Sequence, residues 1–304
     1  MTILTVRHLT RYRYRTPVAF GEHRMMFRPR ESYDQRVLES RLIIAPEPVE
    51  LRYVHDVFGN CVAIARFSGR ARELSFESEV RLDHMPSSPG AHPDDALDPE
   101  LGAFPFRYPE EDAPDLQRCI ERHYPDPEGA LEQWARRFVS ANGATGVIDL
   151  LSAMTRTIHR EFSYKKRLVG GCQPPLETLA RGGGSCRDYA ILMVEAARSL
   201  GLAARFVSGY IHTGKETGHT GGGHTHAWVR VYVPSCGWVE FDPTNGIVGN
   251  QDLIRVAVVR DPRQAVPLSG SWSGASSAYI GMDVQVDVWA DREPALKEVV
   301  SAAA

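Results

Sequence analysis

Polar and apolar residues alternate along the first 85 residues of the chain. The stretches LTVRHLTRYRYR, VLESRLIIAP and ELSFESEVRLDH repeat with a period of two, which is typical of strands with one face in water. The triplet FGN at 58–60 separates two further runs of this kind and predicts a hairpin turn. Because these strands follow one another without helical periodicity between them, residues 1–85 are predicted to form an antiparallel β-sandwich domain.

The pattern changes beyond Met85. Residues 86–129 are rich in proline and in acidic side chains, as in HPDDALDPE and YPEEDAPD. Such a composition predicts a connector, with one short helix near 116–121.

Helical periodicity begins after the connector. EGALEQWARRFVSANG and VIDLLSAMTRTIHREFSY space their apolar residues three and four apart, and a third helix is predicted from residue 186. Strands return in ARFVSGYI, HAWVRVYV, GWVEFDPT, DLIRVAVV and MDVQVDVWA. Helices followed by an antiparallel sheet predict an α+β domain at 130–290, with a tail at 291–304.

Composition and charge narrow the function classes. The formal net charge of -3 and the pI of about 6.4 do not indicate a basic surface of the kind that binds nucleic acid or an anionic membrane. Neither is expected as a partner. The chain has no apolar run of about 18 residues and no apolar stretch of signal-peptide type at its start, which predicts a cytoplasmic protein. Five cysteines without a CxxC pair argue against a disulfide framework and a structural zinc site.

One cysteine lies between a glycine run and an apolar helix, in GGGSCRDYA. Ser185 and Asp188 fit a capping box, which makes Cys186 the first helical residue. At that position its N–H has no acceptor within the helix, and the helix dipole favours a negatively charged sulfur. The sulfur is therefore suited to act as a nucleophile, and the N–H of the same residue is suited to be one donor of an oxyanion hole. The preceding glycines are expected to leave room for a substrate backbone.

A thiolate nucleophile needs a base and a group that orients the base. His226 opens a predicted strand downstream, and Asp242 closes the next one. For both side chains to lie on one face of the sheet, the connection between the strands must have an odd number of residues or carry a bulge near 234–240. The order of helix, strand and strand therefore predicts a Cys186, His226 and Asp242 triad.

Three segments, GGGSCRDYA, HTHAWVRVYVPSCGWVEFDPTNG and VVRDPRQAVPLSGSWSG, resemble the transglutaminase-like superfamily in its bacterial branch with a β-rich N-terminal region. HRMMFRPR and HDVFGNCV are similar to that branch as well. The resemblance implies a papain-like core of helices packed on an antiparallel sheet. It also implies that Cys186 is the nucleophile, His226 the base and Asp242 the orienting carboxylate.

The chemistry of such a triad is acyl transfer from an amide bond of a peptide or protein through a thioester. Water as the acceptor makes the protein a cysteine peptidase or amidase, whereas a lysine amine makes it a cross-linking transglutaminase. We expect hydrolysis, because excluding water requires a shielded acceptor tunnel that no motif indicates. The chemistry requires no cofactor or metal, and no calcium loop is present in the sequence.

Alternatives from other classes remain. His212, His219 and His224 lie near His226, and histidine, cysteine and aspartate are all zinc ligands, so a metal-binding protein is one alternative. An ordinary capped helix with a buried cysteine, in a binding module without catalysis, is the other. Gln173 lies upstream of Cys186 but is not assigned to the oxyanion hole, and Trp228 and Trp238 are expected in the core more than in a cleft wall.

Overall fold

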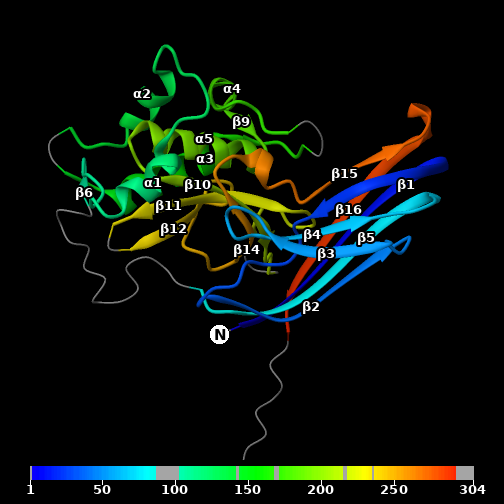
Figure 1. Ribbon diagram of the computed structural model, residues 1–304. Coiled ribbons are helices and arrows are strands. Elements are labelled where there is room, and N and C mark those ends of the chain that lie inside the picture. The colour runs from blue at the N-terminus through cyan, green and yellow to red at the C-terminus, as the bar shows by residue number, and fades with distance from the viewer. Residues whose placement is uncertain are drawn as a thin grey trace, which may run out of the picture.

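Two antiparallel sheets organise the chain, with helices covering one face of the second sheet (Figure 1). The structure is a computed structural model, and it describes residues 2–86, 103–141, 144–167, 171–214, 218–234 and 236–291. Part of the predicted connector, at 87–102, and most of the predicted tail, at 292–304, lie outside these residues. The helices and the mostly antiparallel strands confirm the predicted α+β class.

The first sheet combines strands from both ends of the chain. Its order is β2-β5-β1-β4-β3, and two C-terminal strands, β15 and β16, also pair with β1. The first half of β1 pairs with β5 and β16, while its second half pairs mainly with β4 and β15. The bounds are β1 (Thr2–Met25), β2 (Gln35–Ala45), β3 (Glu50–His55), β4 (Cys61–Arg66), β5 (Arg70–His84), β15 (Leu268–Ser273) and β16 (Tyr279–Ala290).

The strands that pair with the first half of β1 and those that pair with its second half form two groups, and these share one apolar core. Buried residues of β1, β2, β4 and β5 join in one cluster, which includes Val18, Phe20, Ala65 and Phe76. The strands predicted in 1–85 are therefore present, and the FGN turn lies between β3 and β4 as predicted. Because β1 takes part in both groups, hydrogen bonds link all of these strands into one sheet.

The last two strands join the first sheet, although their place in the sequence suggested the second domain at 130–290. β16 pairs with β1 from Leu4–Ala290 to Tyr14–Tyr279. Period-two alternation predicts that such a segment is a strand, but it carries no information about a partner that is distant in the sequence. The chain ends of the described region are thus tied together.

The second sheet carries the helices. Its order is β13-β12-β11-β10-β14, and its strands are β10 (Ala204–Ile211), β11 (His226–Val233), β12 (Gly237–Asp242), β13 (Ile247–Val248) and β14 (Leu253–Val259). The helices are α1 (Ala113–Ile120), α2 (Ala130–Arg136), α3 (Val147–Glu161), α4 (Pro175–Arg181) and α5 (Cys186–Ser199), with short helical turns η1 (Pro262–Gln264) and η2 (Ser276–Ala278). Two-residue strands complete the list: β6 (Ala103–Phe104), β7 (Thr145–Gly146), β8 (Ser163–Tyr164) and β9 (Gly183–Gly184). α1 confirms the short helix predicted in the connector.

Helix α5 lies at the centre of the larger core. It contacts β10 and β11 on one side and the other helices on the other, so most of its residues are buried, among them Ile191, Val194 and Ala197. A helix that is enclosed in this way needs apolar residues on all sides. Among the described residues, no helix is both long enough and apolar enough to cross a membrane.

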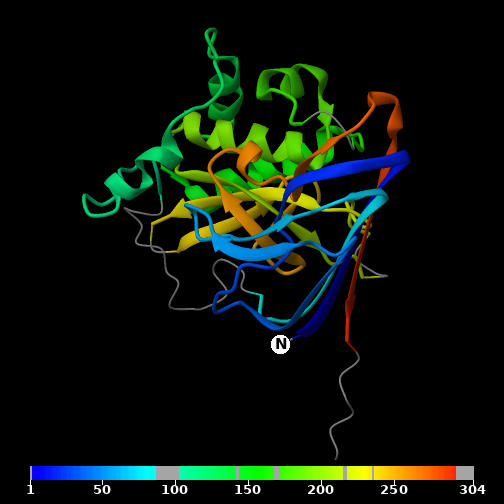
Figure 2. The ribbon, with the colours of Figure 1, turned by 45° about the vertical axis from the view of Figure 1, so that its right-hand side comes forward.

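The first sheet packs against the face of the second sheet that the helices leave open (Figure 2). Leu4, Val80 and Val286 from the first sheet form a buried cluster with Tyr210 and Ile254 from β10 and β14. Burial of apolar side chains from both sheets makes this contact part of the protein core. The two regions therefore form one packed unit.

Amide side chains cover the outer edge of β14. Gln35 donates to the carbonyl of Arg255 at 2.8 Å and accepts from its N–H at 2.9 Å. Asn60 likewise donates to the carbonyl of Val258 at 3.1 Å and accepts from its N–H at 2.9 Å. Edge strands expose unpaired backbone groups, and these two side chains satisfy four of them.

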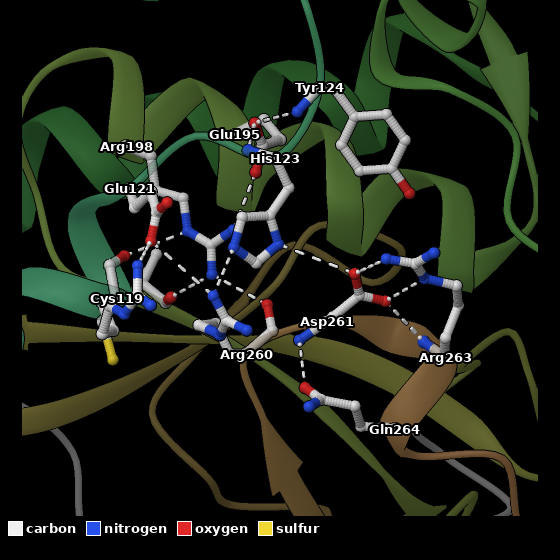
Figure 3. Close-up of polar contacts among 12 residues, drawn as sticks. Cys119, Glu121, His123, Tyr124, Glu195, Arg198, Arg260, Asp261, Arg263 and Gln264 are labelled. Carbon is white, nitrogen blue, oxygen red and sulfur yellow. Dashed lines mark hydrogen bonds and ion pairs between the residues drawn. The ribbon is translucent and has the colours of Figure 1, made fainter.

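A buried arginine joins the connector to the end of α5 (Figure 3). Arg198 pairs with Glu195 at 2.8 Å, and both side chains are fully buried. Its guanidinium also donates to the carbonyls of Cys119, Ala204 and Arg260, at 3.0, 3.0 and 2.8 Å. These bonds fix α5 from its C-terminal end and so help to hold its N-terminus in place.

Candidate active site

The N-terminus of α5 begins at Cys186, as predicted. One oxygen of Asp188 accepts hydrogen bonds from the Ser185 amide at 2.8 Å and the Ser185 hydroxyl at 2.9 Å, which confirms the capping interaction. The other oxygen accepts from the Gln173 amide at 2.6 Å and the Arg167 guanidinium at 2.5 Å. Asp188 is only 1% exposed. It therefore ties three segments together beside Cys186.

The glycines before Cys186 serve the protein's own packing. A Cβ atom at Gly183 would lie 2.8 Å from the Ser163 carbonyl, and one at Gly184 would lie 2.8 Å from the Asp188 side chain. Both glycines form β9, which pairs in parallel with β8. Their small size thus allows close approach of β8 and α5, in place of the substrate backbone that the sequence suggested.

His226 and Asp242 meet across β11 and β12. The pairing of Val233 with Gly237 leaves three residues, 234–236, in the connection, which confirms the predicted odd length. Nε2 of His226 lies 2.8 Å from Oδ2 of Asp242, and both side chains are fully buried. The two side chains therefore lie on the same face of the sheet.

Asp242 is held by the turn that follows it. Its carboxylate accepts from the Thr244 amide at 2.9 Å and from the Asn245 side chain at 2.7 Å. Although burial raises the pKa of Asp242, the charge and hydrogen bond of His226 and the bonds from Asn245 and Thr244 outweigh it, and the pKa is lowered. Asp242 is therefore a carboxylate in the folded protein. Asn245 lies in the segment HTHAWVRVYVPSCGWVEFDPTNG, where no pattern indicates this role.

The other imidazole nitrogen of His226, Nδ1, is buried and forms no hydrogen bond, to sulfur or to any other acceptor, among the described residues. The side chain of Cys186 is nevertheless close enough to act on the charge of the ring. Burial lowers the pKa of His226, but Asp242 and Cys186 together raise it to about 10. The imidazole is thus held as a cation between a carboxylate and a thiol.

Two neighbours restrict the imidazole ring of His226. The indole of Trp228 is stacked on it at 6.0 Å between ring centroids, with 27° between the planes. On another side, a Cβ atom at Gly221 would lie 2.6 Å from Nδ1. The ring therefore has little freedom to rotate. Trp228 is fully buried and Trp238 packs on Arg205, so neither lines the cavity described below.

Tyr164 is a residue that sequence analysis missed. β8 positions it beside Cys186, and its ring packs edge-on against Tyr189 of α5. Burial, followed by the charge and hydrogen bond of Cys186, raises the pKa of Tyr164, so its hydroxyl is a donor to the sulfur. In the sequence this residue is only the end of a helical pattern, and no local signal marks it.

A cavity of about 310 Å³ opens at Cys186, between the first sheet and the N-terminus of α5. Its walls include His8 and Thr10 from β1, Met282 from β16 and His224 from the loop before β11. The first sheet thus supplies a wall of the cavity. No pattern in the sequence indicates this role of the N-terminal region.

His8 has a fixed tautomer in this wall. The Tyr210 hydroxyl donates to the carbonyl of Phe27 at 3.3 Å, so it accepts from Nδ1 of His8 at 3.0 Å. Nε2 of His8 then accepts from the Thr10 hydroxyl at 3.1 Å. Burial, with a smaller effect from His224, lowers the pKa of His8 to about 4. His8 is therefore neutral at physiological pH.

Two of the other predicted metal ligands contact one carboxylate. His219 lies 2.9 Å and His212 lies 3.6 Å from Asp252, whereas His226 is paired with Asp242. Within the part of the chain that the structure describes, no group of three histidine, cysteine or acidic side chains is placed to hold a metal ion. The side-chain amide of Gln173 donates to Thr178 and to the Gly183 carbonyl, which supports β9.

Known proteins resemble this chain along most of its length. Residues 132–243 match the transglutaminase-like superfamily, and residues 4–83 match the bacterial transglutaminase-like N-terminal region. An uncharacterised protein of Mycobacterium tuberculosis is 30% identical over 292 residues, covering 93% of this chain and 91% of that protein. One from Mycobacterium leprae is 25% identical, covering 93% and 98%. A candidate cysteine protease from Cytophaga hutchinsonii has the same fold, with a TM-score of 0.66 at 18% identity over 94% of this chain and 90% of that chain.

Proposed function

Since the chain belongs to the transglutaminase-like superfamily, we propose that it is a thiol-dependent enzyme that transfers the acyl group of a peptide or protein amide. The observation that carries the proposal is the buried His226–Asp242 pair, on whose imidazole the side chain of Cys186 acts, with Cys186 itself in the lining of the cavity. A cationic imidazole stabilises a thiolate, and the first N–H of α5 is available to an oxyanion.

The proposed reaction has two steps. The Cys186 thiolate attacks the amide carbonyl carbon, and the His226 imidazolium gives its Nδ1 proton to the leaving amine as the carbon–nitrogen bond breaks. A thioester remains on Cys186. An acceptor then attacks the thioester while His226 takes the acceptor's proton, and the thiolate and imidazolium are restored. Asp242 keeps the same tautomer and ring orientation throughout.

We propose water as the acceptor, which makes the protein a cysteine peptidase or amidase. Lys166 and Arg167, both exposed, border the cavity at Cys186, so the cavity reaches solvent. Water thus has access to a thioester formed there. A cross-linking transglutaminase, with a lysine amine as the acceptor, is the second candidate that the same chemistry allows.

The test is incubation of the protein with a peptide library, with and without a primary amine donor, followed by mass spectrometry. Hydrolysis predicts cleaved or deamidated products in both samples, whereas cross-linking predicts mass increases that require the amine. The Cys186→Ala variant should form neither product. Turnover that survives in Cys186→Ala, or that a chelator abolishes while a thiol reagent does not, would contradict the thiol mechanism.

A further inference from the structure

The cavity next to Cys186 has a basic wall. Lys166, Arg167 and Arg187 contribute to its lining, and the described lining contains no aspartate or glutamate. His8 and His224 also line the cavity, but the pKa of each is lowered by burial, so neither adds to this charge. The N-terminus of α5 adds a partial positive charge on the same side. The cavity therefore presents a positive potential to whatever enters it.

Two of these cations are not neutralised by the protein. Arg167 pairs with Asp188 at 2.5 Å. Lys166 and Arg187, in contrast, form no ion pair or side-chain hydrogen bond with any residue in the described part of the chain. Lys166 follows β8 and is exposed, while Arg187 follows Cys186 on α5 and is half-buried. Two separate elements thus bring an uncompensated positive charge to the same thiol.

We propose that Lys166 and Arg187 bind a carboxylate of the acyl donor, so that acidic peptide amides are the preferred substrates. This inference rests on the proposed function. The substrates of that function are peptides or proteins, and the anionic group that an unmodified peptide carries is a carboxylate, either at its C-terminus or on aspartate or glutamate. Leu268, Met282 and Val284 line the same cavity and leave an apolar surface for a neighbouring side chain.

Alkylation with two reagents tests the charge preference without a known substrate. Iodoacetate carries a carboxylate and iodoacetamide does not, and both alkylate a thiolate. The rate ratio of iodoacetate to iodoacetamide at Cys186, measured by peptide mass spectrometry, is expected to fall about three- to tenfold in Lys166→Ala and in Arg187→Ala, which is the effect of one partly screened charge pair. Lys165→Ala is the matched control, because Lys165 is exposed and does not line the cavity. It should leave the ratio unchanged.

The outcomes separate this inference from the proposed function. If Cys186 reacts readily but neither variant changes the ratio, the carboxylate site is wrong while the thiol mechanism stands. If Cys186 reacts no faster than Cys61 with either reagent, the proposed function itself fails. Added salt should reduce the wild-type ratio, since exposed charges are screened.

Peptide substrates then distinguish the two sources of the carboxylate. One arm compares a free C-terminus with a C-terminal amide, and the other compares glutamate with glutamine beside the scissile amide. Preference for either carboxylate over its neutral partner supports the inference and identifies the source. Equal turnover of neutral and acidic peptides, or preference for lysine-containing ones, would overturn it.

Discussion

Gly221 occupies a position beside His226 that does not accommodate a side chain. Its φ of +106 is a conformation that side chains rarely adopt, and an added Cβ would lie 2.6 Å from Nδ1 of His226. We expect Gly221→Ala to displace the imidazole from Cys186 and to lower turnover about 100-fold, as misplacement of a reacting group does. Gly218→Ala is the control, because Gly218 also has a positive φ but no atom near the added Cβ.

Both glycine variants should lose about 1 kcal/mol of stability from backbone strain. Only Gly221→Ala should lose turnover and Cys186 alkylation. Equal activity of the two variants would show that the contact with His226 has no functional role.

Because of His8, we expect the free energy of unfolding to fall at acid pH. Its pKa is about 4 in the folded protein and about 6.5 in an unfolded chain. Between these values the unfolded chain binds a proton that the folded protein does not, so this contribution to stability is complete above about pH 6.5 and is lost as the pH falls toward 4. Urea unfolding at pH 7.5 and pH 5 should show a loss on the order of 2 kcal/mol from His8 alone. His8→Gln should reduce the loss by that amount, and an unchanged difference would refute the assignment.

Each of the three residues that we propose as the triad has a local signal in the sequence. A capping box places Cys186 at a helix start, and alternating strands place His226 and Asp242 at strand ends. Tyr164 has no such signal, because it reaches Cys186 only through the pairing of β8 with β9. The wall that His8 supplies depends on packing between two sheets, which local patterns do not specify.

At the scale of elements, α5 depends on Asp188 more than its sequence suggests. Loss of a helix cap alone would cost about 1 kcal/mol. The structure adds an ion pair with Arg167 and a bond from the Gln173 amide, which Asp188→Ala would leave without their buried acceptor. We therefore expect a loss of about 3 kcal/mol in the free energy of unfolding.

The matched control for Asp188→Ala is Asp115→Ala. Asp115 also lies in the first turn of a helix, α1, but it is exposed. Its removal should change stability by less than about 0.5 kcal/mol. Chemical denaturation of both variants checks the difference, and similar losses would mean that Asp188 is only a cap.

Most elements could be predicted from periodicity, and their pairing could not. The strands at 268–273 and 279–290 alternate as strands do, but only the structure assigns them to β1. The role of the glycines at 183 and 184 could not be predicted either, because it depends on Ser163 and Asp188 approaching them in space. Register across β11 and β12 could be predicted, because parity and a short turn determine it.

At the scale of the whole molecule, the two sheets should unfold together. Gln35 and Asn60 satisfy backbone groups of β14, and apolar residues of both sheets share one cluster. The Gln35→Ala, Asn60→Ala double variant removes all four bonds, of which only that to the Arg255 carbonyl is backed by a second donor, the Arg30 amide at 2.9 Å. We expect it to lose about 3 kcal/mol. Hydrogen exchange at the amides of Arg255 and Val258 should accelerate before that of β11.

Gln285→Ala provides the control for this double variant. The side chain of Gln285 is exposed on β16 and, among the described residues, hydrogen-bonds to Asp287 of the same strand. Its removal should leave the unfolding transition and the exchange at β14 unchanged. If the double variant behaves like Gln285→Ala, the amide contacts do not couple the sheets.

The central claim is that His226 holds Cys186 as a thiolate, and the rate of Cys186 alkylation by iodoacetamide tests it most directly. Because the pKa of His226 is raised to about 10, its positive charge persists throughout the range from pH 6 to 9 and is lost only as the pH rises through that value. We predict that at pH 6 to 7 Cys186 is alkylated at least about tenfold faster in the wild type than in His226→Gln, because only the wild type has a cation beside the sulfur. Equal rates in the two proteins would contradict the account.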